Sequence, residues 1–369
     1  MLRRLLMTAL FSTLALLPSV AQAQARGQNP VVNVFNWNDY IDPYMVQRFT
    51  RETGIRVRYD VYDSLETLEG RLSAGRSGFD IIVPTAEPTL SRLVRANALR
   101  ALDPAAIPNL RHLDPAMQQA VAASDPGNRH GAVYLWGTIG LGVNADRIRT
   151  LAPDAPMDSL ALIMDPTHAR RIARCGITML DSAADVIPTV LRYLGRDPNS
   201  TSTDDLREVE RALLAIRPFI RNFSSAGAIE ALASGQSCLA FTYSGDAIQA
   251  AARAREAGRG VVVSYVAPRE GAQLWFDVLA IPADAPNPEN AQAFINFLLQ
   301  PDVMASITNH VRYANAVPAS RALIDADVAN DPGIFPDEAT RARFFTLGPV
   351  AQSVDRARNR VWARFKAGR

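Results

Sequence analysis

Residues 31–62 read VVNVFNWNDYIDPYMVQRFTRETGIRVRYDVY, and this stretch decides the fold class. The apolar run 31–36 predicts a strand, residues 43–53 predict a helix that stops at Gly54, and residues 55–62 predict a second strand. Strands that are separated by helices indicate a mainly parallel sheet with helices on both faces. The sequence therefore predicts an α/β protein.

The same alternation of strands and helices continues along the chain. We expect further helices at 65–74, 157–164, 185–194, 203–216, 226–234, 247–257 and 290–299, the last ending at Pro301, and further strands at 79–83, 176–180, 237–241 and 275–282. The glycine-rich stretch 137–144 is too irregular for a dinucleotide-binding loop, and we interpret it as a flexible crossover between two lobes.

These segments suggest two lobes. We expect residues 30–138 and about 272–310 to form lobe 1, and residues from about 139 to 271 to form lobe 2. A C-terminal segment, residues 311–369, would pack across both lobes. Its basic end, residues 354–369, is expected to be a helix docked on its own protein, although such a helix can also bind a membrane or a partner.

The first residues have the pattern of a secretory signal. Two arginines precede the apolar run 5–17, and the AQA at 21–23 is a small-x-small cleavage site. About 13 apolar residues are too few to span a bilayer comfortably, which disfavours a membrane anchor. We therefore expect residues 1–23 to be a signal peptide, cleaved near Ala23, and the protein to be periplasmic.

Composition and charge exclude several kinds of partner. The formal net charge of +2 includes the two arginines of the leader, so the rest of the chain is electrically balanced. A nucleic-acid-binding protein would need a strong basic excess, so we expect no nucleic-acid partner. The four histidines are scattered without the spacing of metal ligands, and we expect neither a metal site nor a cofactor.

Cys175 and Cys238 are the two cysteines of the chain. An even number of cysteines in an exported protein favours a disulfide. Two buried free thiols remain the alternative, because the sequence does not show that the two residues meet in space.

Three clusters combine aromatic rings with a carboxylate, the chemistry that holds organic cations. They are Trp37-Asn38-Asp39-Tyr40, Tyr243-Ser244-Gly245-Asp246 and Trp275-Phe276-Asp277. Each cluster alone could also be a core aromatic beside a turn or cap carboxylate. Ligands of parallel sheets bind beyond the carboxyl ends of the strands, which is where the first cluster and the segment Thr85 to Glu87 lie. We therefore expect one site built from distant segments.

Several motifs resemble a known family, in order from about residue 31 to the C-terminus. They are FNWNDY (35–40), ETGI (52–55), YDV (59–61), FDIIVP (79–84), YSGD (243–246), FDV (276–278) and YAN (313–315). Together they resemble the periplasmic polyamine-binding proteins of ABC transporters, the putrescine and spermidine receptors. The resemblance implies a two-lobed, type II-like periplasmic binding protein fold, in which each lobe is a mainly parallel sheet flanked by helices and hinge crossovers join the lobes.

The resemblance also implies roles for individual residues. The aromatic box would be Trp37, Tyr243, Trp275, Phe276 and Tyr313, the central ammonium partners Asp246 and Asp277, and the further polar contacts Asn38, Asp39, Tyr40, Thr85, Asp185 and Ser225. Glu87 is an additional candidate, either as a partner of a further ammonium or as a negative charge at the start of the next helix. Cys175 and Cys238 match positions that are disulfide-linked in the resembling receptors.

We therefore expect a receptor without enzymatic activity that captures a polyamine of the putrescine or spermidine type and delivers it to an inner-membrane ABC permease. We expect it to act as a monomer. The alternatives are a receptor for another organic cation or small solute, a carboxylate-dependent glycosidase, and a sensor or adhesion protein with the same pocket.

Overall fold

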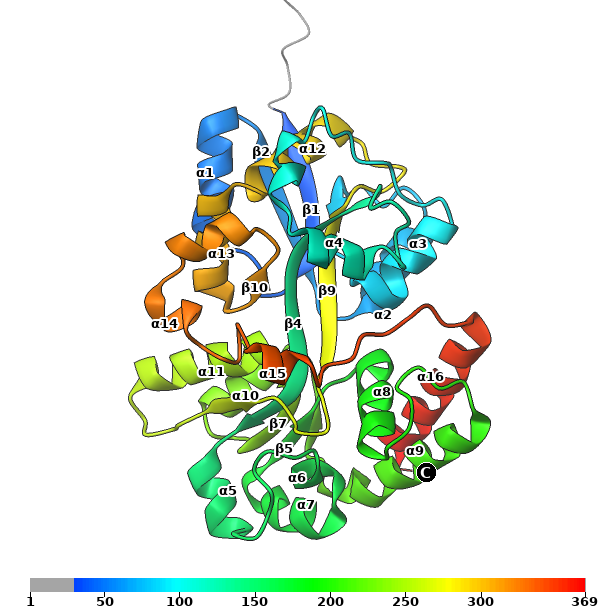
Figure 1. Ribbon diagram of the computed structural model, residues 1–369, viewed down its shortest axis with the longest axis vertical. Helices are drawn as coiled ribbons and strands as arrows, with labels where there is room; N and C mark the ends of the chain where they lie inside the picture. The colour runs from blue at the N-terminus through cyan, green and yellow to red at the C-terminus, as the bar shows by residue number, and fades with distance from the viewer. Residues whose placement is uncertain (1–29, 369) are drawn as a thin grey trace, which may run out of the picture.

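Two long strands join two lobes in the computed structural model, which describes residues 30–368 (Figure 1). Strands β4 (Gly131–Val143) and β9 (Gln273–Ala280) pair in antiparallel fashion and extend from one lobe into the other. In the first lobe β9 also pairs with β3 (Ile81–Ile82), and in the second lobe β4 pairs with β7 (Leu239–Tyr243). The strands of both lobes thus belong to one mixed sheet.

The first lobe is built on parallel strands. Strand β1 (Val31–Trp37) lies between β2 (Arg56–Tyr62) and β3. Helix α1 (Pro43–Thr53) connects β1 to β2, and it begins where the side chain of Asp42 accepts a hydrogen bond from the backbone N–H of Tyr44. The lobe also contains α2 (Leu65–Ser73), α3 (Ser91–Arg95), α4 (Pro115–Val121), α12 (Pro288–Leu298) and α13 (Pro301–Val311).

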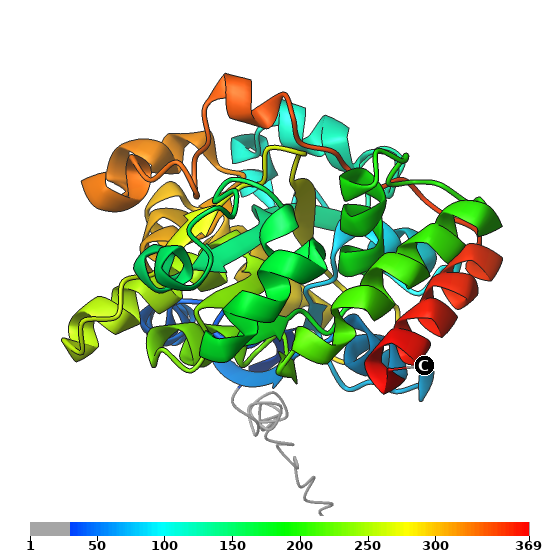
Figure 2. The same ribbon diagram turned by 90° about the horizontal axis from the view of Figure 1, so that it is seen from below.

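The second lobe repeats this plan with β7, β5 (Ile177–Met179) and β6 (Asn222–Phe223), which are parallel to one another. Across the described residues the main strand order is β2-β1-β3-β9-β4-β7-β5-β6, and β8 (Ser264–Val266) and β10 (Ala314–Asn315) pair with β4. Helices surround these strands when the molecule is seen from below (Figure 2). They are α5 (Ala145–Leu151), α6 (Ala161–Met164), α7 (Pro166–Ile172), α8 (Ala183–Tyr193), α9 (Thr203–Ile216), α10 (Ala228–Ala233) and α11 (Ser244–Ala257).

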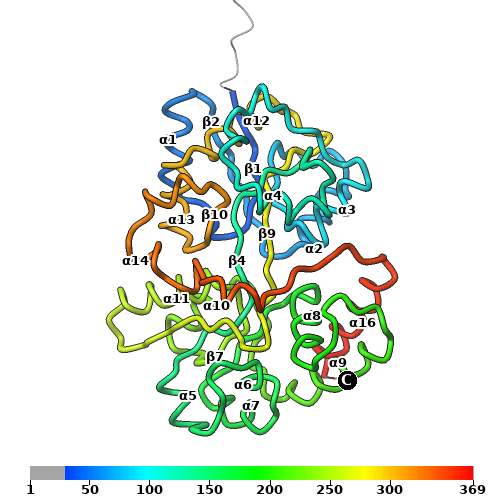
Figure 3. The backbone as a smooth tube through the Cα atoms, viewed as in Figure 1, coloured from blue at the N-terminus to red at the C-terminus, as the bar shows by residue number. Residues whose placement is uncertain are grey.

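The C-terminal segment runs from the first lobe past the two long strands to the second lobe (Figure 3). It contains α14 (Ala326–Ala329) and α15 (Glu338–Arg341), and Phe345 then hydrogen-bonds through its backbone to Ala272 and Leu274 at the start of β9. The segment ends in α16 (Gln352–Ala367), which packs on α8 and α9. The expectation of a tail helix docked on its own protein is confirmed.

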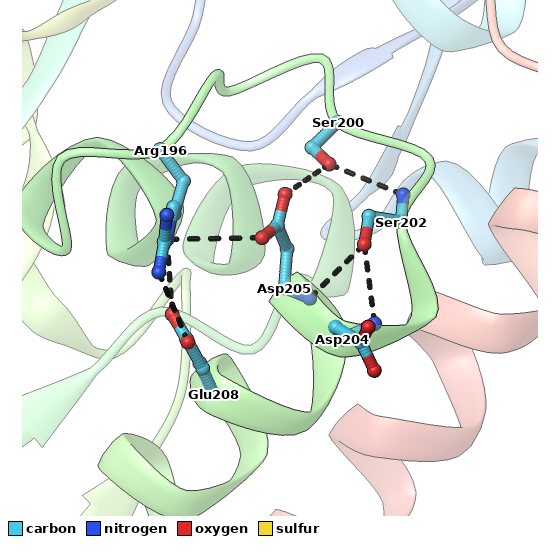
Figure 4. A network of polar contacts seen from close by, with 6 residues as sticks. All are labelled: Arg196, Ser200, Ser202, Asp204, Asp205 and Glu208. Carbon is cyan, nitrogen blue, oxygen red and sulfur yellow. Dashed lines mark hydrogen bonds and ion pairs between the residues drawn. The ribbon is translucent and has the colours of Figure 1, made fainter.

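A polar network fixes the loop that precedes α9 (Figure 4). The hydroxyl of Ser202 accepts hydrogen bonds from the backbone N–H groups of Asp204 and Asp205, so it caps the helix. Arg196 donates two hydrogen bonds of 3.0 Å to the carboxylate of Glu208 in the same network. The start of α9, on which α16 rests, is therefore well defined.

Residues 137–144 cross between the lobes as predicted, but the crossover is a strand and not a loop. Residues 137–143 belong to β4, in which every residue is buried. Gly137 is needed there because a Cβ atom at this position would lie 2.6 Å from the indole of Trp275. The glycines of this stretch thus allow close packing in the strand that connects the lobes.

Two of the helix predictions also need correction. Only residues Ala161–Met164 of the expected helix 157–164 are helical. Pro301 was expected only to end helix 290–299, but it begins α13, because a proline is well tolerated in the first turn of a helix, where its missing N–H would have no helical partner.

Cys175 and Cys238 form a disulfide, which confirms the prediction. Cys175 comes just before β5 and Cys238 just before β7, and these strands are neighbours in the sheet. No helix of residues 30–368 is long and apolar enough to cross a membrane. The predicted signal peptide, residues 1–23, lies outside the described residues.

We predict that replacing both cysteines by serine lowers the free energy of unfolding by about 2 to 4 kcal/mol, because the bond constrains an unfolded loop with a sequence separation of 63 residues. Denaturant titration of the oxidised wild type and the double variant measures the difference. The oxidised wild type should show no free thiol after denaturation, and two reactive thiols per chain would contradict the assignment.

Candidate functional site

A cavity of about 840 Å³, including the part open to solvent, is lined by residues of both lobes and of β9. The loops after β1, β2 and β3 line it from the first lobe, and the loops after β5, β6 and β7 line it from the second. All six loops follow the carboxyl ends of parallel strands, the usual place for a ligand in such sheets.

The structure brings nearly all the predicted site residues together around this cavity. Thirteen of them line it: Trp37, Asn38, Asp39, Tyr40, Thr85, Glu87, Asp185, Ser225, Tyr243, Asp246, Trp275, Asp277 and Tyr313.

Phe276 is the exception, and its place in the predicted aromatic box was wrong. Successive side chains of a strand point to opposite faces of the sheet. Trp275 and Asp277 on β9 both line the main cavity, so Phe276 between them faces away and contributes to a smaller neighbouring pocket. The same alternation identifies Gln273 as a residue on the cavity side of β9, which the sequence analysis missed.

Asp277 is the most buried carboxylate of the cavity, with 4% of its surface exposed. The hydroxyl of Thr85 donates a hydrogen bond of 2.6 Å to its Oδ1 atom. Burial raises the pKa of Asp277 to about 7, although the bond from Thr85 acts in the opposite direction. The hydroxyl of Tyr40 lies near this carboxylate but is buried without a hydrogen bond of good geometry within the described residues.

Asp246 lies in the first turn of α11 and is held by Tyr313. The Tyr313 hydroxyl donates a hydrogen bond of 2.6 Å to the Asp246 carboxylate and accepts one of 3.2 Å from the Asp246 backbone N–H. Burial raises the pKa of Asp246 to about 7. Gly245 permits this arrangement, because a Cβ atom there would lie 2.5 Å from the Tyr313 ring.

Asp185, in the first turn of α8, is bound by neutral donors. The Tyr243 hydroxyl lies 2.8 Å from Oδ2 and the Gln273 amide nitrogen lies 3.0 Å from Oδ1. Burial raises the pKa of Asp185. Both oxygens therefore already have a partner, and Asp185 holds the Tyr243 ring in place.

Aromatic rings from distant segments meet edge to face in the cavity. The Trp275 ring centroid lies 5.8 Å from that of Tyr243 and 5.3 Å from that of Tyr313, and Tyr40 contacts Tyr313 at 5.4 Å. The Trp37 indole N–H donates a hydrogen bond of 3.0 Å to the Val83 carbonyl, which fixes this ring on the first lobe. The contacts give the rings defined orientations around a common space.

Glu87 also lines the cavity, but its two carboxylate oxygens have partners. Ser91 and Ser124 each donate a hydroxyl hydrogen bond of 2.8 Å to it. Burial raises the pKa of Glu87, and these hydrogen bonds act against that rise. The contacts favour a structural role for Glu87 over that of a partner for a further ammonium.

An ion pair connects the lobes at the rim of the cavity. Asp39, in the loop after β1, lies 3.3 Å from Nη2 of Arg253 on α11, and both side chains are 43% exposed. Asn38 beside it donates an amide hydrogen bond of 3.3 Å to the same carboxylate. The rim charge of Asp39 is thus balanced by the protein itself.

The charge of the cavity lining is one-sided. Eight carboxylates line it, and none of the described lining residues is arginine, lysine or histidine. They are Asp39, Asp63, Glu66, Glu87, Asp181, Asp185, Asp246 and Asp277. Asp63, Glu66 and Asp181 were not among the predicted site residues. Asp63 follows β2, Glu66 lies in the first turn of α2, and Asp181 follows β5. Such a lining favours a cationic ligand.

Comparisons with known proteins agree with this architecture. A family model described as bacterial extracellular solute-binding protein matches residues 44–336. The chain is 44% identical to the putrescine-binding periplasmic protein PotF of Escherichia coli over 96% of each chain, and 41% identical to the putrescine-binding periplasmic protein SpuD of Pseudomonas aeruginosa over the full length of both.

A solved structure is also similar over most of the chain. The putative spermidine/putrescine ABC transporter from Listeria monocytogenes superimposes with a TM-score of 0.82 at 28% identity, covering 93% of this chain and 100% of that one. The predicted two-lobed α/β fold is confirmed.

The raised pKa of Asp277 predicts how the ligand-free protein responds to pH. Its pKa of about 7 in the folded state lies above the ordinary value of 3.8, so its burial costs stability as the pH rises from about 4 to about 7. We predict that Asp277→Asn raises the free energy of unfolding at pH 8 by roughly 2 to 4 kcal/mol and has little effect at pH 4. Denaturant titration at both pH values tests this, and equal differences at the two would contradict it.

Proposed function

The chain belongs to the bacterial extracellular solute-binding protein family, and we propose that it is the periplasmic receptor of an ABC transporter for an aliphatic polyamine of the putrescine or spermidine type. The observation that carries the proposal is the cavity lining, with eight carboxylates and no basic side chain among the described residues. An aliphatic diamine carries two strongly hydrated charges, and their dehydration is favourable only when carboxylates and hydroxyls replace the water.

Asp277 and Asp246 are the proposed partners of the two ammonium groups. Asp277 is buried and Asp246 is half-buried, and neither forms an ion pair with a described basic residue within 4 Å. The oxygen of the Tyr40 hydroxyl is a further acceptor near Asp277. An ammonium group of the ligand would thus provide each of these carboxylates with a positively charged partner.

The aromatic rings are proposed to cover the methylene groups between the two charges. Trp275 touches both Tyr243 and Tyr313, so these rings form a continuous apolar wall. Each ring face that lies over an ammonium adds about 0.5 to 2 kcal/mol of cation–π attraction. Anions would be repelled by the carboxylates of this lining.

Capture is proposed to close the two lobes, residues 30–138 with about 272–310 and residues 139–271, on the ligand. Because the two lobes contribute different parts of one cavity, a ligand that touches both binds the closed form more tightly. The closed receptor would deliver the amine to an inner-membrane ABC permease. It would act as a periplasmic monomer without enzymatic activity or nucleic-acid partner, after cleavage of its leader near Ala23.

The names of the relatives support the class of ligand. Two relatives that match at least 96% of this chain are named putrescine-binding periplasmic proteins. Titration calorimetry with putrescine, cadaverine, spermidine, spermine and agmatine tests the proposal, and recovery of the bound amine chemically unchanged tests the absence of enzymatic turnover. Failure of all five amines to bind would refute it.

We predict that Asp277→Asn weakens putrescine binding by roughly 2 to 4 kcal/mol, because it keeps the shape of the side chain and removes the charge of a buried ammonium partner. Glu87→Gln is the matched control, since it removes a cavity carboxylate whose oxygens are held by Ser91 and Ser124. Calorimetry should show a change of less than about 1 kcal/mol for this control. Equal losses in the two variants would remove Asp277 from its proposed role.

A further inference from the structure

The C-terminal helix places an ammonium group beside the cavity. Lys366 on α16 is the only lysine of the chain, and its Nζ atom lies 2.8 and 3.0 Å from the two carboxylate oxygens of Asp181. The indole N–H of Trp362, one turn earlier, donates a hydrogen bond of 3.1 Å to the same carboxylate. Asp181 lines the cavity from the loop between β5 and α8.

The lysine head group has the chemistry of the proposed ligand. A primary ammonium at the end of an aliphatic chain is also the end of every linear polyamine, so Lys366 occupies Asp181 as a ligand ammonium would. The side chains of Asp181 and Lys366 are 37% and 39% exposed. An exposed ion pair is weak, so a ligand ammonium can take the place of the lysine ammonium.

The other cavity carboxylates differ from Asp181 in their partners. Hydroxyl and amide groups bind Asp185 and Glu87, and Arg253 binds Asp39 at the rim. Asp181 is paired with an alkylammonium, and the pairing depends on a helix at the far end of the chain. The charge of Asp181 is therefore neutralised by the Lys366 side chain, which a single substitution can remove.

We propose that the Asp181–Lys366 ion pair sets the number of ammonium groups that the cavity accepts. With Lys366 in place, Asp181 is withheld from the ligand and the cavity favours a diamine. Without the lysine ammonium, Asp181 becomes a subsite for the additional ammonium of a triamine such as spermidine. The inference rests on the proposed function and concerns which amines that cavity selects.

Helix α16 is held by contacts that do not involve the Lys366 side chain. Arg364 forms an ion pair with Glu210, and Arg358 donates hydrogen bonds to the carbonyl oxygens of Pro198 and Ser200 in the loop before α9. Phe365 is fully buried against the second lobe. A substitution confined to the lysine head group therefore leaves the helix docked.

The experiment is a pair of calorimetric titrations, with putrescine and with spermidine, on the wild type and three variants. Lys366→Gln should raise the ratio of spermidine affinity to putrescine affinity about fivefold, the effect that an exposed ion pair supports. Lys366→Arg keeps the positive charge and should leave the ratio unchanged. The double variant Asp181→Asn/Lys366→Gln should return the ratio to the wild-type value.

The outcomes separate the inference from the function on which it rests. An unchanged ratio in Lys366→Gln overturns the inference while the receptor function stands, because a freed Asp181 would favour the additional ammonium of spermidine. A raised ratio that persists in the double variant also overturns it, because Asp181 would not be the group involved. If the wild type binds neither amine, the proposed function fails and the inference fails with it.

Discussion

The burial of ionisable carboxylates without a basic partner is the constraint on which the cavity depends. Asp277 is buried and Asp246 is half-buried, and the loss of solvation raises the pKa of each to about 7. A core built only for stability would avoid this cost by placing apolar residues there. Hydrogen bonds from the hydroxyls of Thr85 and Tyr313 offset part of this desolvation cost. A bound cation would offset the rest.

The sheet topology places these carboxylates between the lobes. Asp277 lies on β9, one of the two strands that extend through both lobes, whereas Asp246 lies in the first turn of α11, the helix that follows β7. The close approach of β4 to Trp275 requires Gly137, and the contact of Tyr313 with α11 requires Gly245. Because these two glycines have no side chain, the aromatic rings can approach the carboxylates. The same two residues therefore serve both the packing of the strands and helices and the geometry of the proposed ligand site.

Much of the fold and of the site could be predicted from the sequence, because local patterns carried the information. Hydrophobic alternation located β1 and α1, and the carboxyl ends of the strands located Trp37 and Thr85. The assignment of Phe276 failed because Trp275, Phe276 and Asp277 were placed in the site together. Successive side chains of a strand point to opposite faces, so Phe276 cannot face the same cavity as its two neighbours. Asp181 could not be predicted, since its partner Lys366 is 185 residues away and meets it only through the docking of α16.

The most direct test of this account is to count the protons released when putrescine binds at pH 7. Titration calorimetry in buffers of different ionisation enthalpy measures this number. Two carboxylates with pKa values of about 7 are each half protonated at this pH, so pairing both with ammonium groups should release about one proton per ligand, and almost none at pH 9. Binding at pH 7 without proton release would contradict the central role of Asp277 and Asp246.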